Sequence, residues 1–281
     1  MSKKPEEITG SVSRIIPFSC VDGPGNRFVI FLQGCNFSCK NCHNPHTMGI
    51  CDHCGDCVPG CPSGALFIDS GKVTWNQSIC ENCDQCIDIC PRSSSPMTQL
   101  LTVAEVITQL ETAVPFLTGI TVSGGESTMQ LKFIRALFKT IKQRSHLQHL
   151  TCLVDSNGYL PVSGWEKLLS VMDGAMIDLK ACNNDLHLWL TGRANHRVLD
   201  SIDFLYKRQK LTEVRWLAIP EITDTSEELT AISAFLKTTA PEAPLRINAF
   251  SNSAVKGQAR QWQNMSSERI PLLEAELFTT S

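Results

Sequence analysis

The sequence predicts an α/β protein built on a parallel sheet, with a small cysteine-rich domain inserted after the first strand. Two observations support this prediction. Short, continuously apolar runs alternate with helical segments, and most of the cysteines fall in one stretch. Continuous apolarity is typical of parallel strands covered on both faces. The alternation fits an open or a closed sheet, and six runs lead us to favour a partial, TIM-like (β/α)6 barrel over a doubly wound sheet.

The predicted strands are 27–33, 119–124, 150–156, 174–180, 213–220 and 245–250. Segments with helical spacing of apolar residues lie between them, among them 102–115, and a further helix is predicted at 267–277. Three helices begin with a capping-box pattern, in which a Ser or Thr precedes a Glu by three positions. The pairs are Thr102 with Glu105, Ser163 with Glu166, and Thr225 with Glu228.

Composition limits the function classes. The net charge of −3 leaves no positive surplus for nucleic acid. No stretch reaches the roughly 18 apolar residues of a membrane span, and the start lacks the apolar run of a signal peptide. We therefore expect a soluble, cytoplasmic monomer that contacts neither nucleic acid nor membrane. The chain has 14 cysteines, and a reducing compartment favours metal or cluster binding over disulfides.

Eleven of the 14 cysteines fall between Cys35 and Cys90, and the other three are expected to be small buried apolar residues. Residues 51–62 and 80–91 both read C-x2-C-x2-C-x3-C-P, the spacing of two-cluster ferredoxins. The fourth cysteine of each run then reaches across to the other cluster. One cluster would be held by Cys51, Cys54, Cys57 and Cys90, and the second by Cys80, Cys83, Cys86 and Cys61. Residues 65–75, between the runs, suit a hairpin. Zinc is the weaker alternative.

A third group, Cys35, Cys39 and Cys42, has the spacing C-x3-C-x2-C and no fourth cysteine nearby. His43 is a poor fourth zinc ligand, because it directly follows Cys42. A four-iron cluster on three thiolates would leave one iron open to an external ligand. The group follows the first strand. The segments 123–126, 155–158 and 178–180 follow later strands, at the edge of a parallel sheet where ligands collect.

At these residues the chain resembles a known family. The segment 18–45, with D-G-P-G-x-R before the cysteine loop, resembles the signature of the radical S-adenosylmethionine (SAM) enzymes, and within them the activating enzymes of glycyl radical enzymes. With the two-cluster insert it looks closest to the YjjW branch. The resemblance implies a radical SAM barrel formed by residues 1–46 and 98–281, with a ferredoxin-like domain at 47–97. Because its eight cysteines would fully ligate the two auxiliary clusters, neither is expected to bind substrate directly.

The resemblance also implies an activity and its partners. The enzyme would be an oxidoreductase of the formate C-acetyltransferase activating type. It would carry three [4Fe-4S] clusters, one of which binds SAM at Cys35, Cys39 and Cys42. An electron from flavodoxin or ferredoxin would cleave SAM to a 5′-deoxyadenosyl radical, which removes a hydrogen from a glycine of a partner enzyme. The implied SAM contacts are Asn41, Cys42, His43, Gly124, Gly125, Glu126, Asp155, Ser156, Asn157, Asp178, Lys180 and Arg215.

Plainer interpretations exist for several of these residues. The glycine pair of 123–126 also suits a tight turn, and residues 155–158 are a good turn sequence. Asp178 and Lys180, two apart on one strand, could form a simple ion pair, and Arg215 could be solvated. Ser251 stands where the family commonly has a histidine, so no SAM contact is assigned there.

Three other functions remain as alternatives. They are a radical SAM enzyme that acts on a small molecule, an electron-transfer iron–sulfur protein, and a zinc-binding scaffold.

Overall fold

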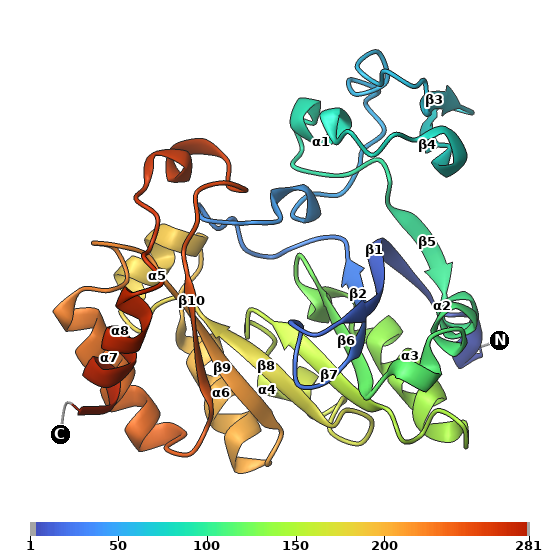
Figure 1. The fold of residues 1–281 in the computed structure, drawn as a ribbon. Coiled ribbons are helices and arrows are strands. Elements are labelled where there is room, and N and C mark those ends of the chain that lie inside the picture. Colours follow the sequence, from blue (N-terminus) through green and yellow to red (C-terminus); the bar gives the residue numbers. More distant parts are fainter. Residues whose placement is uncertain (1–3, 280–281) are drawn as a thin grey trace.

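A computed structural model describes residues 4–279 and contains all six predicted parallel strands (Figure 1). They are β2 (Arg27–Leu32), β6 (Gly119–Gly124), β7 (Thr151–Ser156), β8 (Gly174–Leu179), β9 (Leu211–Ala218) and β10 (Leu245–Ala249). They pair in chain order from β2 to β10. A doubly wound sheet would reverse its strand order in the middle. The order observed is that of a partial barrel.

Two strands at the β2 edge were not predicted. β1 (Thr9–Ser19) pairs antiparallel with β2, and β5 (Gln99–Thr102) pairs antiparallel with the first residues of β1. β1 contains Gly10 and Pro17, which weaken a strand signal in the sequence. Pro17 is tolerated because β5 pairs only with residues 9–12, so this end of β1 forms the edge of the sheet.

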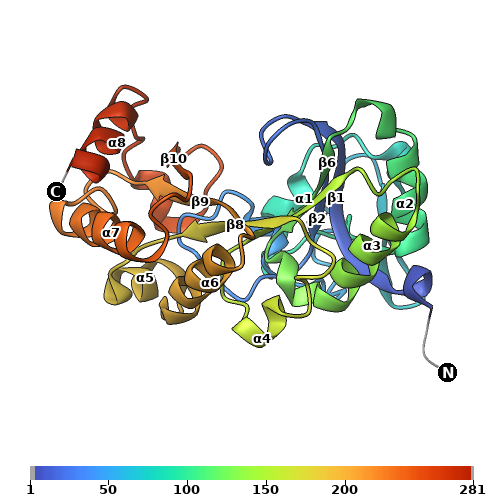
Figure 2. The ribbon, with the colours of Figure 1, turned by 90° about the horizontal axis from the view of Figure 1, so that it is seen from below.

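Helices follow the parallel strands, and α3, α4, α5 and α6 lie along the outer side of the curved sheet (Figure 2). The α-helices of the barrel are α2 (Val103–Glu111), α3 (Leu131–Gln143), α4 (Val162–Trp165), α5 (Asn184–Thr191), α6 (His196–Lys207), α7 (Ser226–Thr239) and α8 (Arg269–Thr279). The short 3-10 helices are η1 (Pro5–Glu7), η2 (Pro45–Thr47), η3 (Gln77–Ile79), η4 (Val114–Phe116), η5 (Ser127–Gln130) and η6 (Gly257–Gln261). Within the described residues, no helix is long and apolar enough to cross a membrane.

One of the three predicted capping boxes is confirmed in full. Thr102 and Glu105 cap α2 reciprocally. The prediction for Ser163 is wrong, because Pro161 is the N-cap of α4 and Ser163 lies inside the helix. Thr225 caps α7, but the carboxylate of Glu228 turns away from it and accepts hydrogen bonds from the backbone N–H groups of residues 182 and 183. Glu228 therefore joins α7 to the start of α5.

The segment between β2 and β5 forms a separate small unit above the sheet (Figure 1). It contains the predicted hairpin, β3 (Leu66–Asp69) with β4 (Lys72–Trp75), and the helix α1 (Gln85–Ile89). Its buried residues Cys57, Leu66, Val73 and Cys86 form a cluster distinct from the main core. Of the three remaining cysteines in the chain, Cys152 is buried as expected, Cys182 is half-buried, and Cys20 is exposed.

Arg27, the last residue of the D-G-P-G-x-R segment, is fully buried beneath the sheet. Its guanidinium donates to the carbonyls of Pro24, Ile120 and Thr151 and to the hydroxyls of Thr121 and Thr151. Burial lowers its pKa to about 10, so it stays charged at neutral pH. Arg27 therefore ties the loop before β2 to the first residues of β6 and β7.

We expect Arg27→Met to lower the free energy of unfolding by at least about 2 kcal/mol, because each buried acceptor left without a donor costs about 1–3 kcal/mol. Urea unfolding of the anaerobically reconstituted protein, followed by circular dichroism, measures this loss. Arg246→Met is the matched control, since Arg246 is exposed and, among the described residues, donates a single hydrogen bond, to the carbonyl of Val21. A comparable loss in both variants would contradict the role assigned to Arg27.

Candidate active site

The loop carrying Cys35, Cys39 and Cys42 is held by backbone hydrogen bonds from two sides. The N–H groups of Gly34 and Cys35 donate to the carbonyls of residues 47 and 48, at distances of 2.8 and 2.9 Å. The N–H groups of Ser38 and Lys40 donate to the carbonyls of Thr191 and Leu190 at the end of α5, both at 2.9 Å. These hydrogen bonds fix the shape of the irregular loop. All three thiols belong to this one short segment.

Burial sets the chemistry of these three thiols. It raises the pKa of Cys35 to about 12 and that of Cys39 to about 11, and it also raises the pKa of Cys42. Free thiols at these positions are therefore protonated at neutral pH. A bound metal deprotonates a coordinating thiol, so this donor set suits a site in which the thiolates are stabilised by coordination.

Glu126 is fully buried and joins the loops after β6 and β7. Its carboxylate accepts hydrogen bonds from the backbone N–H groups of Thr128 and Asn157, and from the hydroxyls of Thr128 and Ser156, at 2.5–2.9 Å. Burial raises its pKa, and these four donors act to lower it. The carboxylate is thus engaged inside the protein, and its predicted contact with SAM stays a prediction.

The glycine pair before Glu126 permits a close approach between backbones. Gly124 has φ = +133°, and a Cβ there would lie 2.1 Å from the carbonyl oxygen of Leu32. A Cβ on Gly125 would lie 2.5 Å from the carbonyl oxygen of Gly34. The two glycines therefore allow this segment to pack closely against β2 and the cysteine loop. Their role goes beyond forming the tight turn considered above.

The segment after β7 contacts the cysteine loop directly. The side-chain amide of Asn157 donates to Oδ1 of Asn36 at 2.8 Å and lies 3.9 Å from Sγ of Cys35. Its own Oδ1 accepts from the N–H of Tyr159, as in a turn. Residues 155–158 therefore form the predicted turn, which places an amide beside the first thiol, and their predicted contact with SAM stays a prediction.

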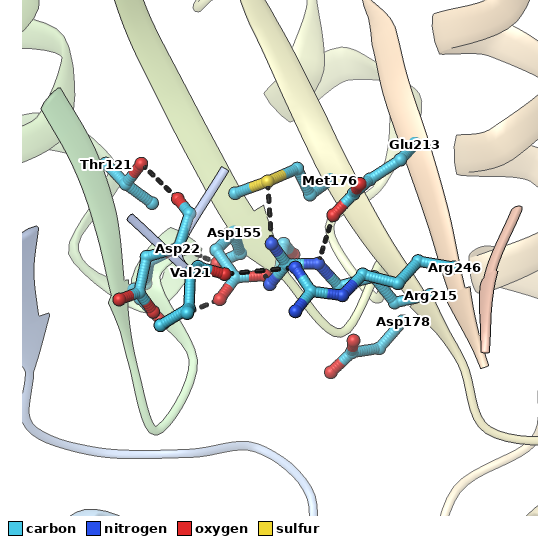
Figure 3. Close-up of polar contacts among 12 residues, drawn as sticks. Val21, Asp22, Thr121, Asp155, Met176, Asp178, Glu213, Arg215 and Arg246 are labelled. Carbon is cyan, nitrogen blue, oxygen red and sulfur yellow. Dashed lines mark hydrogen bonds and ion pairs between the residues drawn. The ribbon is translucent and has the colours of Figure 1, made fainter. Parts of the chain in front are cut away.

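Arg215 is at the centre of a charged group on the inner face of the sheet (Figure 3). Its guanidinium donates to Asp155 at 3.1 Å, to Glu213 at 2.5 Å and to the sulfur of Met176 at 2.9 Å. Only 11% of the Arg215 side chain is exposed, so the solvated alternative is wrong. Burial raises the pKa of Asp155 to about 6, although Arg215 acts to lower it.

Asp178 and Lys180 form the ion pair that the sequence allowed, with 2.8 Å between Nζ and Oδ2. Burial acts to lower the pKa of Lys180, but the Asp178 carboxylate and the thiols of Cys39 and Cys42 raise it overall. The ammonium is therefore within electrostatic reach of two loop thiols. The ion pair thus holds the Lys180 ammonium near the three cysteines.

Asn41 and His43 lie on either side of the last loop cysteine. Asn41 is buried, and its Oδ1 has no hydrogen-bond partner within the described residues. His43 donates through Nε2 to the carbonyl oxygen of Ser251 at 2.9 Å, and its ring is 5.8 Å from that of Phe250. A histidine ring therefore lies beside Ser251, but it is that of His43 in the cysteine loop and not a histidine at position 251.

The eight cysteines of the insert fall into two groups of four, each lining one small cavity. One cavity is lined by Cys51, Cys54, Cys57 and Cys90, and the other by Cys61, Cys80, Cys83 and Cys86. These are the two sets that the ferredoxin spacing predicts. In the described part of the chain, no three Cys, His, Asp or Glu side chains are close enough to hold a single metal ion.

Sequence reasoning missed Glu213, Arg246 and Lys256. Glu213 is two residues before Arg215 on β9, and strand alternation could have placed both on one face. Arg246 pairs in register with Arg215 on the neighbouring strand, which requires knowing the strand order. Lys256 lines a cavity of about 320 Å³ together with Cys39 and Cys42. It belongs to the irregular segment after β10, where no periodic signal exists.

Comparisons with known proteins bear on the family of this chain. The radical SAM superfamily matches residues 29–231. The pyruvate formate-lyase-activating enzyme of Streptococcus mutans is 30% identical over 237 residues, covering 83% of this chain and 74% of the relative. A Haemophilus influenzae protein named as a glycyl-radical enzyme activating enzyme is 29% identical, covering 90% and 86%.

One solved structure supports the fold alone. A radical SAM methyltransferase from Sphaerobacter thermophilus superposes with a TM-score of 0.55 at 14% identity, covering 89% of this chain and 63% of that one.

We expect Arg215→Met to destabilise the protein by about 3–5 kcal/mol at pH 8, because Asp155 and Glu213 would remain buried without their counter-charge. The loss should be smaller at pH 5. The pKa of Asp155 already stands near 6 in the folded protein and rises further without Arg215, so protonation removes the unpaired charge. Urea unfolding at both pH values measures the difference.

Arg197→Met serves as the control for this variant, because the Arg197 guanidinium lies over the ring of Tyr159 in a cation–π pair and forms no ion pair within residues 4–279. Its effect on stability should be small and the same at pH 5 and pH 8. An Arg215→Met loss that does not change with pH would contradict the assignment of the charged group.

Proposed function

The chain belongs to the radical SAM superfamily and, within it, to the activating enzymes of glycyl radical enzymes, and on this premise we propose its reaction. It is a SAM-dependent oxidoreductase. We propose that it reductively cleaves SAM to methionine and a 5′-deoxyadenosyl radical. That radical then takes a hydrogen atom from a backbone glycine of a partner glycyl radical enzyme, which leaves 5′-deoxyadenosine and a glycyl radical.

The observation that carries this proposal is the fixed loop of three half-buried thiols beside a polar barrel interior. No fourth cysteine joins Cys35, Cys39 and Cys42 in the loop. Cys35, Cys39 and Cys42 would hold a [4Fe-4S] cluster, which would supply the electron that cleaves the sulfonium of SAM, and the iron without a cysteine ligand would be open to SAM. The protein's own groups fix the loop, exclude water and balance charge around it.

The residues present fit SAM as a ligand. The buried Oδ1 of Asn41 lacks a donor, and the amino group of adenine is a donor. Asp155, Asp178, Lys180 and Arg215 present charges of both signs from three neighbouring strands. We propose that these side chains, with Ser156 and the backbone of residues 124–126 and 41–43, hold the sugar, the amino acid part and the adenine.

We further propose that residues 47–97 form a ferredoxin-like domain with two auxiliary [4Fe-4S] clusters, which gives three clusters per chain. The two cysteine-lined cavities support this, because the thiols surround a space instead of meeting around one point as zinc ligands do. A flavodoxin or ferredoxin would deliver the electron. The chain would act as a monomer on its protein substrate.

A large cavity offers space for a segment of a protein substrate. It has a volume of about 1050 Å³ and lies between β1, the insert and residues 253–260, with His43 and His46 in its wall. We propose that the glycine-bearing loop of the partner enters here to reach the bound SAM.

Cys39→Ala is expected to abolish SAM cleavage and lower the iron content from about twelve to about eight per chain, since each [4Fe-4S] cluster contributes four irons. Iron and sulfide analysis after anaerobic reconstitution, with 5′-deoxyadenosine measured under a low-potential reductant, tests both effects. Cys20→Ala is the control, because this exposed thiol lies outside the three groups. Normal cleavage by the Cys39 variant would rule out the mechanism.

Anaerobic mixing with the glycyl radical enzyme encoded beside this gene should give a glycine-centred radical in electron paramagnetic resonance. If that glycine is deuterated, the deuterium should appear in 5′-deoxyadenosine, because the proposed step transfers this hydrogen atom. SAM cleavage without a radical on the protein would instead favour the small-molecule alternative.

A further inference from the structure

Trp75, the last residue of β4, carries a polar group that the fold leaves without a partner. Its indole Nε1 has less than 1 Å² of accessible surface and no hydrogen-bond partner within the described residues. A buried donor that is left unpaired costs about 1–3 kcal/mol. Such a group calls for an explanation, and an acceptor that the protein binds is one.

The ring of Trp75 lines two spaces. One is the large cavity of about 1050 Å³, which admits water. The other is the small cavity lined by Cys61, Cys80, Cys83 and Cys86. Nε1 is one of the ring atoms that the protein covers, and the four thiols that share the small cavity with this ring are where a bound group could supply its acceptor.

We propose that the indole N–H of Trp75 donates a hydrogen bond to a sulfur of the cluster held by these four cysteines and raises its reduction potential. The inference rests on the auxiliary clusters of the proposed function. Reduction adds negative charge to the cluster, and a donor aimed at its sulfur stabilises that charge. Hydrogen bonds to the sulfurs are among the factors that set such potentials.

The two cysteine groups differ at this point although their sequence spacing is the same. Val73 lines the cavity of Cys51, Cys54, Cys57 and Cys90, while Trp75 lines the other one. Residues 73 and 75 share one face of β4. This face therefore presents an apolar side chain to one cluster and an N–H donor to the other.

Charge alone does not favour the second cluster. Its cavity wall includes Glu81 and Asp84, and the first cavity has Asp52 and Asp56, with Asp52 paired to Arg92 at 2.6 Å. Carboxylates oppose the added negative charge at both sites. The indole N–H is therefore the feature that favours reduction of the second cluster.

The cluster beside Trp75 would be held in part by α1, which Lys256 links to the cavity beside the cysteine loop. Cys86 belongs to α1, and Lys256 donates to the carbonyl of Ile87 in α1 at 3.0 Å. Lys256 also lines the cavity beside Cys39 and Cys42. A cluster with a raised potential in this place would hold the electron next to the SAM site.

Trp75→Phe tests the inference, because phenylalanine keeps an aromatic ring and removes the N–H. Trp216→Phe is the matched control, since Trp216 has the other buried indole without a partner but belongs to β9. Both changes are made in protein with Cys35, Cys39 and Cys42 replaced by alanine, so that only the insert clusters contribute. Potentiometric titration followed by electron paramagnetic resonance reads their potentials.

We expect Trp75→Phe to shift one of the two potentials to a more negative value and Trp216→Phe to shift neither. A tenfold change in the equilibrium constant of a one-electron reduction corresponds to 59 mV. If both clusters assemble and neither potential changes, the role of Trp75 is overturned while the proposed function stands. If the wild-type insert binds no four-iron cluster, the inference and the auxiliary clusters fail together.

A second measurement detects the hydrogen bond directly. In protein labelled with ¹⁵N-indole tryptophan, the reduced insert should show a hyperfine coupling to one ¹⁵N nucleus and to an exchangeable proton. Both couplings should disappear in Trp75→Phe and persist in Trp216→Phe. Reduced clusters without such a coupling in the otherwise unaltered labelled protein would overturn the hydrogen bond.

Discussion

The site depends on hydrogen bonds to the backbone of the cysteine loop. This loop is irregular, so its buried N–H groups need acceptors outside regular secondary structure. Each buried peptide N–H without an acceptor costs free energy comparable to a lost hydrogen bond. Residues 34–40 direct their donors to carbonyls at 47–48 and at the end of α5. Because α5 is itself positioned by Glu228 of α7, the place of the three thiols is set by elements on both sides of the barrel.

Buried charge is the second constraint, and two carboxylates meet it differently. Glu126 accepts four hydrogen bonds and has no cationic partner among residues 4–279, so it behaves as a structural acceptor between two loops. Asp155 is paired with Arg215 and the hydroxyl of Ser123, and burial raises its pKa as it does that of Glu126. Because 17% of the Asp155 side chain is exposed while Glu126 is fully buried, Asp155 is the carboxylate that could respond to a bound ligand.

The sequence predicted the six parallel strands because each is a compact apolar run, and it predicted the cysteine groups because ligand spacing is local. It did not predict β1, whose Gly10 and Pro17 hide a strand that forms by pairing with β2 and β5. The sequence also did not predict the hydrogen bonds from residues 182 and 183 to Glu228, or the burial of Arg215. Both depend on residues more than 30 positions away. Local sequence patterns do not predict contacts between residues that are far apart in the chain.

The same limit explains why the two ferredoxin-like runs look alike in sequence and differ in structure. Their cysteine spacing is identical, but the hairpin between them contributes Val73 to one cavity and Trp75 to the other. A strand side chain alternates with period two, so residues two apart share a face and can reach neighbouring sites. A repeat that duplicates ligands therefore need not duplicate surroundings, and differences in redox behaviour can arise from the segment that joins the two halves.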